Sequence, residues 1–309
     1  MNDKLVTIVR KELKENLKSI KYWAIIILFI LLYLASSYAV GFALRGFGGP
    51  VGITRRTRMI VQLTSSVTGT MTYIAPLLGI ALGFSAIAAE RDKGTIRLLL
   101  ARPIYRDDVV NGKVLAAIVL IVLAVGMSTA IAIPLSVILQ GLNVTAEDLL
   151  RLVLTVIPAT LLALAYYAIA LFASVNAGRS SHALVIGIVT WIFFAFLLPM
   201  LASFVAFYTL GPPPAITFNA TRPGQMPEQF REYYSRYQQI YSQFQLISPN
   251  DRYTSLAGAL FSIREQTEAY ESLIGILSRR WIDVIVLLAY TIVFIALSYV
   301  FFVRRQETK

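Results

Sequence analysis

Six long apolar stretches constrain this chain more than any other feature of its sequence. They cover approximately Tyr22–Leu44, Ser66–Ala89, Val114–Leu139, Leu152–Ala177, Ala183–Leu210 and Val284–Val303. A helix needs about 20 apolar residues to cross a hydrocarbon core about 30 Å thick. Each stretch has that length and contains no Asp, Glu, Lys, Arg or His. The sequence therefore predicts an all-α membrane protein with six transmembrane helices.

The composition excludes several other classes of protein. Charged residues make up 15% of the 309 residues, whereas a soluble domain carries about a quarter. With no Cys there can be no disulfide scaffold, and a single His leaves almost no soft ligands for zinc, haem or an iron–sulfur cluster. We therefore expect no metal site and no cofactor in this chain.

Lysine and arginine are distributed unequally between the two sides of the predicted membrane. Sixteen of them lie in the first 21 residues, the loop 90–113, the segment after span four and the C-terminal tail, against five in the short loops opposite. The positive-inside rule places the richer side, and both termini, in the cytoplasm. We interpret the net charge of +11 as topology and attraction to anionic membrane lipids, with no nucleic acid as partner. The predicted location is the cell membrane.

Residues 1–21 form a predicted amphipathic helix ahead of span one. The apolar side chains recur at helical spacing and share one face, while the basic side chains lie opposite. Such a helix lies in the inner leaflet. A positively charged stop for span one is a second interpretation, and the two are compatible. The apolar residues are Leu5, Ile8, Val9, Leu13 and Leu17, and the basic ones are Arg10, Lys11, Lys14 and Lys18.

The remaining chain divides into three parts. Residues 22–210 hold spans one to five, residues 211–283 form an external insertion, and residues 284–309 hold span six with a cytoplasmic tail. Within the insertion, a run of aromatic residues predicts one helix, Ser248–Asp251 a turn, and Ser255–Leu277 a second helix. The expected structure is an external helical hairpin between spans five and six.

The aromatic face of the first insertion helix has two interpretations. It packs within the hairpin or against a partner, or it forms a lid or lateral gate for substrate. The lid residues in the second case are Tyr233, Tyr234, Tyr237, Tyr241 and Phe244.

Two smaller patterns concern helix packing and glycosylation. Gly79 and Gly83 form a small-xxx-small pair in span two, which is typical of close helix packing. Asn143 and Asn219 each begin an Asn-x-Thr triplet on the predicted outside, and such triplets are glycosylation acceptors in hosts that glycosylate their surface.

Catalytic and nucleotide-binding motifs are missing from the sequence. It contains no Gly-x-x-x-x-Gly-Lys-Ser/Thr loop, no His-Glu-x-x-His and no Gly-x-Ser-x-Gly. His182 stands at a predicted cytoplasmic helix start, where capping is the simpler role. We therefore expect no enzyme. The uncharged spans also disfavour an ion-coupled carrier, because a coupling ion usually needs an ionisable residue at membrane depth. They suit an amphipathic or lipid-like cargo moved by energy from elsewhere.

The segment between spans two and three is the most specific signal. Charged residues follow the end of span two, and a helix break at Gly94-Thr95 comes next. The pattern then predicts a short amphipathic helix over Ile96–Ala101 that ends at Pro103, and a further helix whose start Asp107 can cap. This half-apolar surface suits the docking of a cytoplasmic partner. A solvated loop that carries positive-inside charge is the alternative.

The order Glu-x-x-x-Gly-Thr, Leu-Leu, Arg-Pro, Arg and Gly-Lys in this segment resembles the signature of type-2 permeases of ATP-binding-cassette (ABC) transporters. The resemblance implies a coupling helix that contacts separate cytoplasmic ABC ATPase subunits, which bind ATP and Mg. It also implies a second permease copy or a paralogue. The long external insertion departs from the commonest members and leaves the substrate open. By position, the coupling residues are Glu90, Arg91, Gly94, Thr95, Leu98, Leu99, Pro103, Arg106, Gly112 and Lys113.

These observations predict the transmembrane permease subunit of an ATP-driven exporter. Two alternatives from other classes remain. One is an ion-coupled secondary carrier or channel, and the other is a membrane anchor or sensor that transports nothing.

Overall fold

The computed structural model describes residues 2–46, 55–94, 106–214, 228–262 and 270–304. These residues form helices and turns, with no β-strand among them. Six helical segments are long and apolar enough to cross a membrane, which confirms the prediction of an all-helical chain with six spans. They are Ile20–Ala43, Ile60–Asp92, Asp108–Gln140, Ala146–Asn176, Ser180–Leu210 and Leu273–Arg304.

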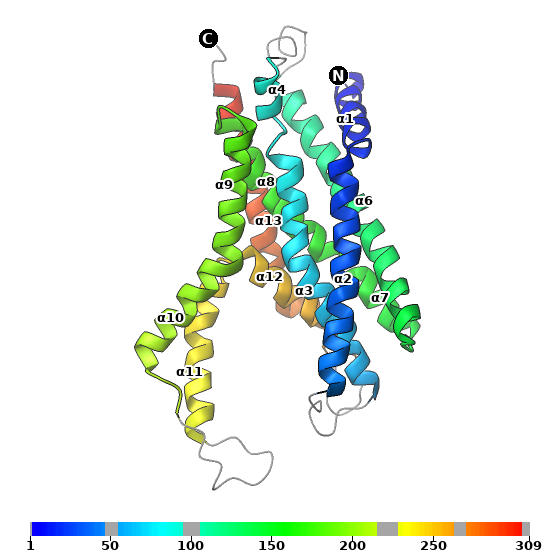
Figure 1. Cartoon of the computed structure of the whole chain (residues 1–309). Helices are drawn as coiled ribbons and strands as arrows, with labels where there is room; N and C mark the ends of the chain where they lie inside the picture. The colour runs from blue at the N-terminus through cyan, green and yellow to red at the C-terminus, as the bar shows by residue number, and fades with distance from the viewer. Residues whose placement is uncertain (1, 47–54, 95–105, 215–227, 263–269, 305–309) are drawn as a thin grey trace.

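Figure 1 shows the arrangement of the helices. Helices α1, α4, the first turns of α6 and the last turns of α13 lie at one end of the molecule, and α7 and α11 lie toward the other. The helices are α1 (Asn2–Leu17), α2 (Ile20–Gly46), α3 (Arg55–Gly83), α4 (Ala88–Asp92), α6 (Arg106–Gln140), α7 (Ala146–Leu154), α8 (Val156–Asn176), α9 (Ser180–Ile192), the π-helical η1 (Phe193–Leu197), α10 (Leu198–Leu210), α11 (Glu228–Gln245), α12 (Pro249–Ala259) and α13 (Leu273–Arg304).

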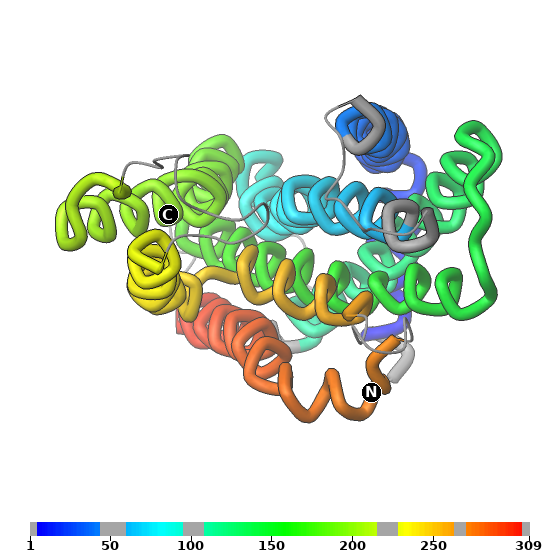
Figure 2. The backbone as a smooth tube through the Cα atoms, turned by 90° about the horizontal axis from the view of Figure 1, so that it is seen from below, coloured from blue at the N-terminus to red at the C-terminus, as the bar shows by residue number. Residues whose placement is uncertain are grey.

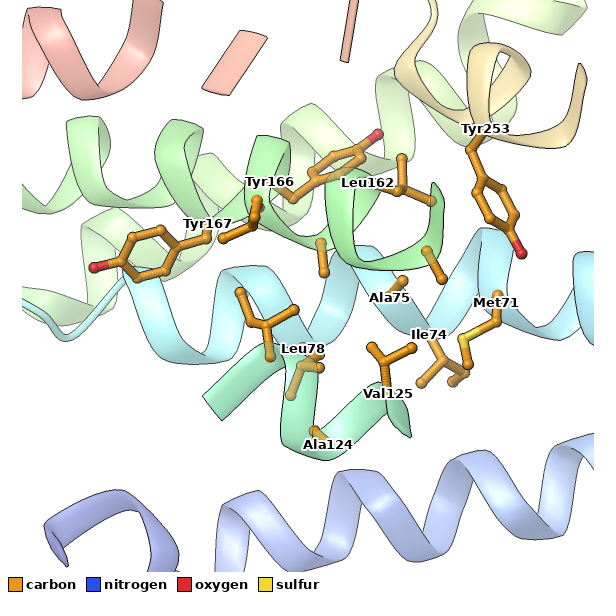
Figure 3. Close-up of a cluster of buried hydrophobic side chains, with 14 of the residues drawn as sticks. Met71, Ile74, Ala75, Leu78, Ala124, Val125, Leu162, Tyr166, Tyr167 and Tyr253 are labelled. Carbon is orange, nitrogen blue, oxygen red and sulfur yellow. The ribbon is translucent and has the colours of Figure 1, made fainter. Parts of the chain in front are cut away.

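Helix α8 is the centre of the bundle. Figure 2 shows α3 and α13 on opposite sides of it, and these two helices make its most extensive contacts. Its Tyr166 and Tyr167 are almost completely buried. Figure 3 shows the apolar core that α8 forms with side chains of α3, α6 and α12, among them Leu78, Val125 and Tyr253.

Two glycines of α3 lie directly against α8. A Cβ at Gly79 would overlap the carbonyl oxygen of Ala163 and lie 2.8 Å from the amide nitrogen of Tyr167. A Cβ at Gly83 would lie 2.7 Å from the Tyr167 carbonyl oxygen and 2.8 Å from the Ala170 Cβ. Because these distances are shorter than van der Waals contact, the two backbones approach this closely only where α3 has no side chain.

The second half of the external insertion differs from the predicted hairpin. Helix α12 begins at Pro249, six residues before the expected Ser255, because Ser248 caps it by accepting a hydrogen bond from the Asp251 amide at 3.2 Å. The predicted turn is thus a helix start. Helix α12 ends at Ala259 and packs on α13, α3 and α8 with its Tyr253 side chain fully buried.

Span six is longer than its apolar stretch, since α13 begins at Leu273 and not at Val284. The buried Asp283 carboxylate in its third turn is neutralised by Arg252 of α12 at 2.7 Å and accepts a hydrogen bond from Ser255 at 3.0 Å. The apolar stretch excluded this Asp because it is charged, and hydropathy cannot identify a neutralising partner that lies 31 residues away in sequence.

Span five contains a local irregularity. The five residues of η1 adopt π-helical geometry between α9 and α10, directly before Pro199. A proline lacks the amide hydrogen that an α-helix would use, and π-turns commonly accommodate such a defect. The axis changes direction between α9 and α10 in Figure 1.

Candidate coupling site

The described part of the predicted coupling segment lies at the end of the molecule that holds α1. Glu90 and Arg91 belong to α4, Gly94 follows that helix, and Gly112 and Lys113 lie in the second turn of α6. Helix α6 begins at Arg106, so Asp107 falls inside its first turn. The predicted residues Thr95, Leu98, Leu99 and Pro103, and the predicted helix Ile96–Ala101, lie outside the described residues.

An ion cluster joins the two ends of this segment. The Lys113 ammonium lies 3.0 Å from a Glu90 carboxylate oxygen and 2.6 Å from a Glu12 carboxylate oxygen of α1. The Lys113 side chain is 5% exposed, and those of Glu12 and Glu90 are each 15% exposed. A charge that is buried this far requires a partner, because transfer from water to a low-dielectric environment is strongly unfavourable. The cluster therefore fixes α1, α4 and α6 to one another.

Helix α1 also packs tightly on α6 next to this cluster. A Cβ at Gly112 would lie 2.6 Å from the Ile8 side chain, so the absence of one lets α1 settle against α6. Ile8 and Leu13 pack against the main hydrophobic core. The half-buried apolar face of α1 is thus turned toward the bundle, and Glu12 is the residue that sequence reasoning missed here.

Helix α4 is attached to the C-terminal end of α8 by two polar side chains, Ser174 and Arg91. The Ser174 hydroxyl accepts hydrogen bonds from the amides of Ile87 and Ala88 at 3.0 and 2.9 Å, which satisfies donors at the helix start. Arg91 donates to the carbonyls of Val175 and Ala177 at 3.2 and 2.6 Å.

The end of α4 is held by the start of α9 and by a glycine. The Asp92 carboxylate accepts a hydrogen bond from the Ser180 amide at 2.9 Å. Gly94 then adopts φ of +67°, a left-handed conformation that glycine enters without strain. Helix α4 is therefore fixed to α1, α6, α8 and α9, and it ends at a defined residue.

The predicted aromatic lid residues lie on α11, which packs along α10. The Tyr237 hydroxyl is 3.1 Å from the Ser203 hydroxyl, and Tyr233 donates to the Gly211 carbonyl at 3.0 Å. The rings of Tyr237 and Tyr241 stack with centroids 5.9 Å apart, while the Tyr234 side chain is 47% exposed. The fifth residue of the set, Phe244, is half-buried.

The structure describes one of the two predicted glycosylation residues. Asn143 is exposed in the connection between α6 and α7, toward the end opposite α1. Asn219 lies outside the described residues.

A polar cluster between α2, α3 and α6 escaped sequence analysis. The Gln140 amide donates to the hydroxyls of Ser37 and Ser136 at 2.8 Å each, and Gln62 donates to the Ser37 carbonyl at 3.0 Å and to the Gln140 side chain. It links α2, α3 and α6 through residues far apart in sequence. Both glutamines stand just outside the predicted apolar stretches Ser66–Ala89 and Val114–Leu139, so no local pattern indicated the cluster.

A second polar cluster connects α7 to the residues before α13 through hydrogen bonds and a cation–π contact. Arg151 donates to the carbonyls of Leu260 and Glu271 at 2.5 and 2.8 Å and lies over the Tyr270 ring. The Tyr270 hydroxyl donates to Asp148 at 2.5 Å. Within the described ranges, no group of three or more His, Cys, Asp or Glu side chains gathers that could hold a metal ion.

Comparison with known proteins agrees with this architecture. The sequence profile of the family described as "ABC-2 family transporter protein" matches residues 6–306, nearly the whole chain. The chain belongs to the ABC-2 transporter family. As a multi-pass ABC transporter permease it is a non-catalytic transport component, and permeases of this kind pair with ATPase subunits that bind ATP.

Two curated relatives are similar to part of this ABC-2 permease. The protein described as "Probable ABC transporter permease protein NosY" from Pseudomonas aeruginosa is 36% identical over 120 residues, which is 38% of this chain and 40% of the relative. The protein of the same description from Stutzerimonas stutzeri is 32% identical over 140 residues, 44% of this chain and 47% of the relative. The chain thus matches less than half of the length of either relative.

Proposed function

We propose that this permease is the membrane subunit of an ATP-driven exporter and that cytoplasmic ABC ATPase subunits dock on the segment 90–113. The observation that carries the proposal is the Lys113–Glu90–Glu12 cluster, which holds both ends of that segment and α1 together. A docking surface has to be rigid if it is to transmit force. ATP and Mg bind in the partner ATPase.

The proposed orientation has α1, α4 and both termini in the cytoplasm. The positive-inside distribution of Lys and Arg supports it, and so does the position of α1, α4 and the last turns of α13 at one end. In this orientation the amphipathic α1 lies at the inner leaflet, and α11 with Asn143 and Asn219 lies outside.

The proposed path of force runs from the docking segment into the centre of the bundle. A displacement of α4 acts on α8 through Ser174 and Arg91, and a displacement of the first turns of α6 acts on α1 through Lys113. A displacement of α8 then displaces α3, because the two backbones are in close contact at Gly79 and Gly83. Closure of the ATPases would therefore move α3, α6 and α8 as one body.

The proposed cargo is amphipathic or lipid-like, carried between this chain and a second copy or a paralogue. The charges near the external end support this over ion-coupled transport. Arg252 and Asp283 are a buried ion pair, and the buried Arg151 is neutralised by the exposed Glu147. In the span Ser180–Leu210, only 11% of an apolar stretch of 18 residues is buried inside the chain, which leaves apolar surface for a partner permease or lipid.

Co-purification from the native membrane in mild detergent tests the proposed docking. We expect a stoichiometric protein with a Walker loop, identified by mass spectrometry, and we expect its loss when Glu90 and residues 94–97 are replaced. The matched control replaces exposed Arg231 and Arg236 of α11 and should retain the ATPase. Recovery of the chain without any ATPase, under conditions that preserve other ABC complexes, would overturn the proposal.

A further inference from the structure

A cavity of about 550 Å³ opens beside the ion cluster, at the end of the molecule that carries α1 and α4. Side chains of α1, α2, α3, α4 and α6 line it, and Ser180 at the start of α9 closes one side. Its volume falls within the range of about 300–1,000 Å³ that is typical of small-molecule sites. No step of the proposed coupling uses this space.

The charges around the cavity favour an anion. Four lysines and three glutamates line it. Glu12 and Glu90 neutralise Lys113, and Lys11 lies 3.8 Å from both Glu15 and Glu90.

The two other lysines, Lys21 and Lys93, are exposed and form no ion pair with a carboxylate of the described residues. The Lys21 ammonium lies 6.0 Å from the centroid of the Phe84 ring. With four lysines against three glutamates, the cavity lining has a net charge of +1, and Lys21 and Lys93 are its unpaired cations within the described residues.

Part of the cavity lining is apolar. Tyr22, Ile25, Leu78 and Leu82 line it where α2 and α3 enter the membrane-spanning part. Ile25 and Leu78 also line a second, narrow pocket that lies between α2, α3 and α6 and is almost entirely apolar. The lining therefore changes from an ammonium group at Lys21 to hydrocarbon at Ile25 over about one turn of α2.

We propose that this cavity binds an anionic phospholipid of the cytoplasmic leaflet. The lipid phosphate lies against Lys21 and Lys93, and the first part of an acyl chain lies along Ile25 and Leu78. Basic pockets between transmembrane helices on the cytoplasmic side are known to bind lipid headgroups. A free phosphate ion would use only the lysines, whereas a lipid uses both the lysines and the apolar wall.

Binding at this position has a consequence for the coupling site. Because the cavity is lined by α1, α2, α3 and α4 together, a bound lipid bridges the interfacial helix to the bundle next to the Lys113 cluster. The inference rests on the proposed cytoplasmic orientation of α1. The binding assay below contains no ATPase, so a failure of the lipid site and a failure of ATPase docking are separately visible.

The test is a titration of the delipidated full-length chain in detergent with dioctanoyl phosphatidylglycerol, followed by native mass spectrometry. We expect one lipid bound per chain. The Lys21→Gln/Lys93→Gln variant should bind it roughly thirtyfold more weakly, at about fivefold for each lysine near an anionic lipid. The matched control Lys14→Gln/Lys18→Gln removes two exposed lysines that do not line the cavity, and it should bind like the unmodified chain.

A second variant separates shape from charge. Ala81→Phe places a ring in the cavity and leaves every lysine in position, so we expect it to reduce phosphatidylglycerol binding as well. Dioctanoyl phosphatidylcholine should bind more weakly than phosphatidylglycerol, and inorganic phosphate should not displace the lipid. Equal binding by the Lys21/Lys93 and Lys14/Lys18 variants would overturn the proposal. Complete displacement by inorganic phosphate would overturn it too, because the site would then recognise a free anion.

Discussion

Replacing Lys113 by Met tests whether the ion cluster holds α1 against α6. The Lys113 side chain is 5% exposed and lies 2.6 Å from Glu12 and 3.0 Å from Glu90, so its loss leaves two largely buried carboxylates without a cation. Removing one partner of a buried ion pair destabilises by about 3–5 kcal/mol. Since each carboxylate side chain remains 15% exposed to solvent, we expect the lower end, about 3 kcal/mol, for the detachment of α1.

The absence of native cysteines provides a direct assay of that detachment. A Leu13→Cys substitution places a single thiol on the half-buried face of α1. Thiol labelling then reports how often α1 leaves the bundle, because labelling follows the population of the open state when opening is fast. A destabilisation of about 3 kcal/mol raises the labelling rate roughly 150-fold. A thiol at Val6, which is 51% exposed, should label at the same rate with or without Lys113.

The control for charge is the variant Glu12→Gln/Glu90→Gln/Lys113→Met, which removes all three charges together. Replacing a complete buried ion cluster by neutral groups is often close to neutral in stability, so we expect most of the protection of Leu13→Cys to return. A labelling rate for Lys113→Met within about fivefold of the parent would refute the reasoning. An equally fast rate in the triple variant would show that packing, and not charge, holds α1.

Further predictions concern the bundle and its external end. Gly79→Ala should lower the free energy of unfolding by about 3 kcal/mol, because its Cβ meets the backbone of α8. Gly126→Ala, whose Cβ would have no atom within 4 Å, should be neutral or stabilising by up to about 1 kcal/mol. Equal melting temperatures of the two variants in detergent would contradict this. Tyr270→Phe removes a donor 2.5 Å from Asp148 and should cost about 1.5–3 kcal/mol, measured as a lower Tm. Burial raises the pKa of the Asp251 carboxyl, so Asp251→Asn should be more stable than the unmodified chain at pH 7. It should lose this advantage as the pH falls through the raised pKa toward about 4, and a pH-independent difference would contradict it.

Hydropathy predicted the six spans because each apolar stretch is long enough to identify itself locally. The predicted span boundaries were wrong where a helix continues through polar residues. Helix α13 begins at Leu273, before the charged residues that precede Val284, because the buried Asp283 is neutralised by Arg252 from another helix. A window average cannot anticipate such a partner. The same limit applies to α12, whose position depends on packing against α3, α8 and α13.

The candidate coupling site was predictable in part. The segment 90–113 carried its own pattern, and Glu90 and Lys113 stand at its two ends. Glu12 could not be assigned to the cluster from sequence, because it is 101 residues from Lys113. The pairing of Gln62 with Gln140 across α3 and α6 was hidden for the same reason, since these residues are 78 positions apart.

The central claim is that the ATPase docks at the end of the molecule that carries α4. Site-specific cross-linking tests it most directly, because the chain has no cysteine and a single introduced thiol can carry a photoreactive group. We place this group at Lys93, which is exposed next to α4, and in a separate variant at Tyr208, which is 83% exposed near the end of α10. We predict that the group at Lys93, and not the group at Tyr208, captures a Walker-loop ATPase from native membranes. Capture at Tyr208, or at neither position while the ATPase still co-purifies, would contradict it.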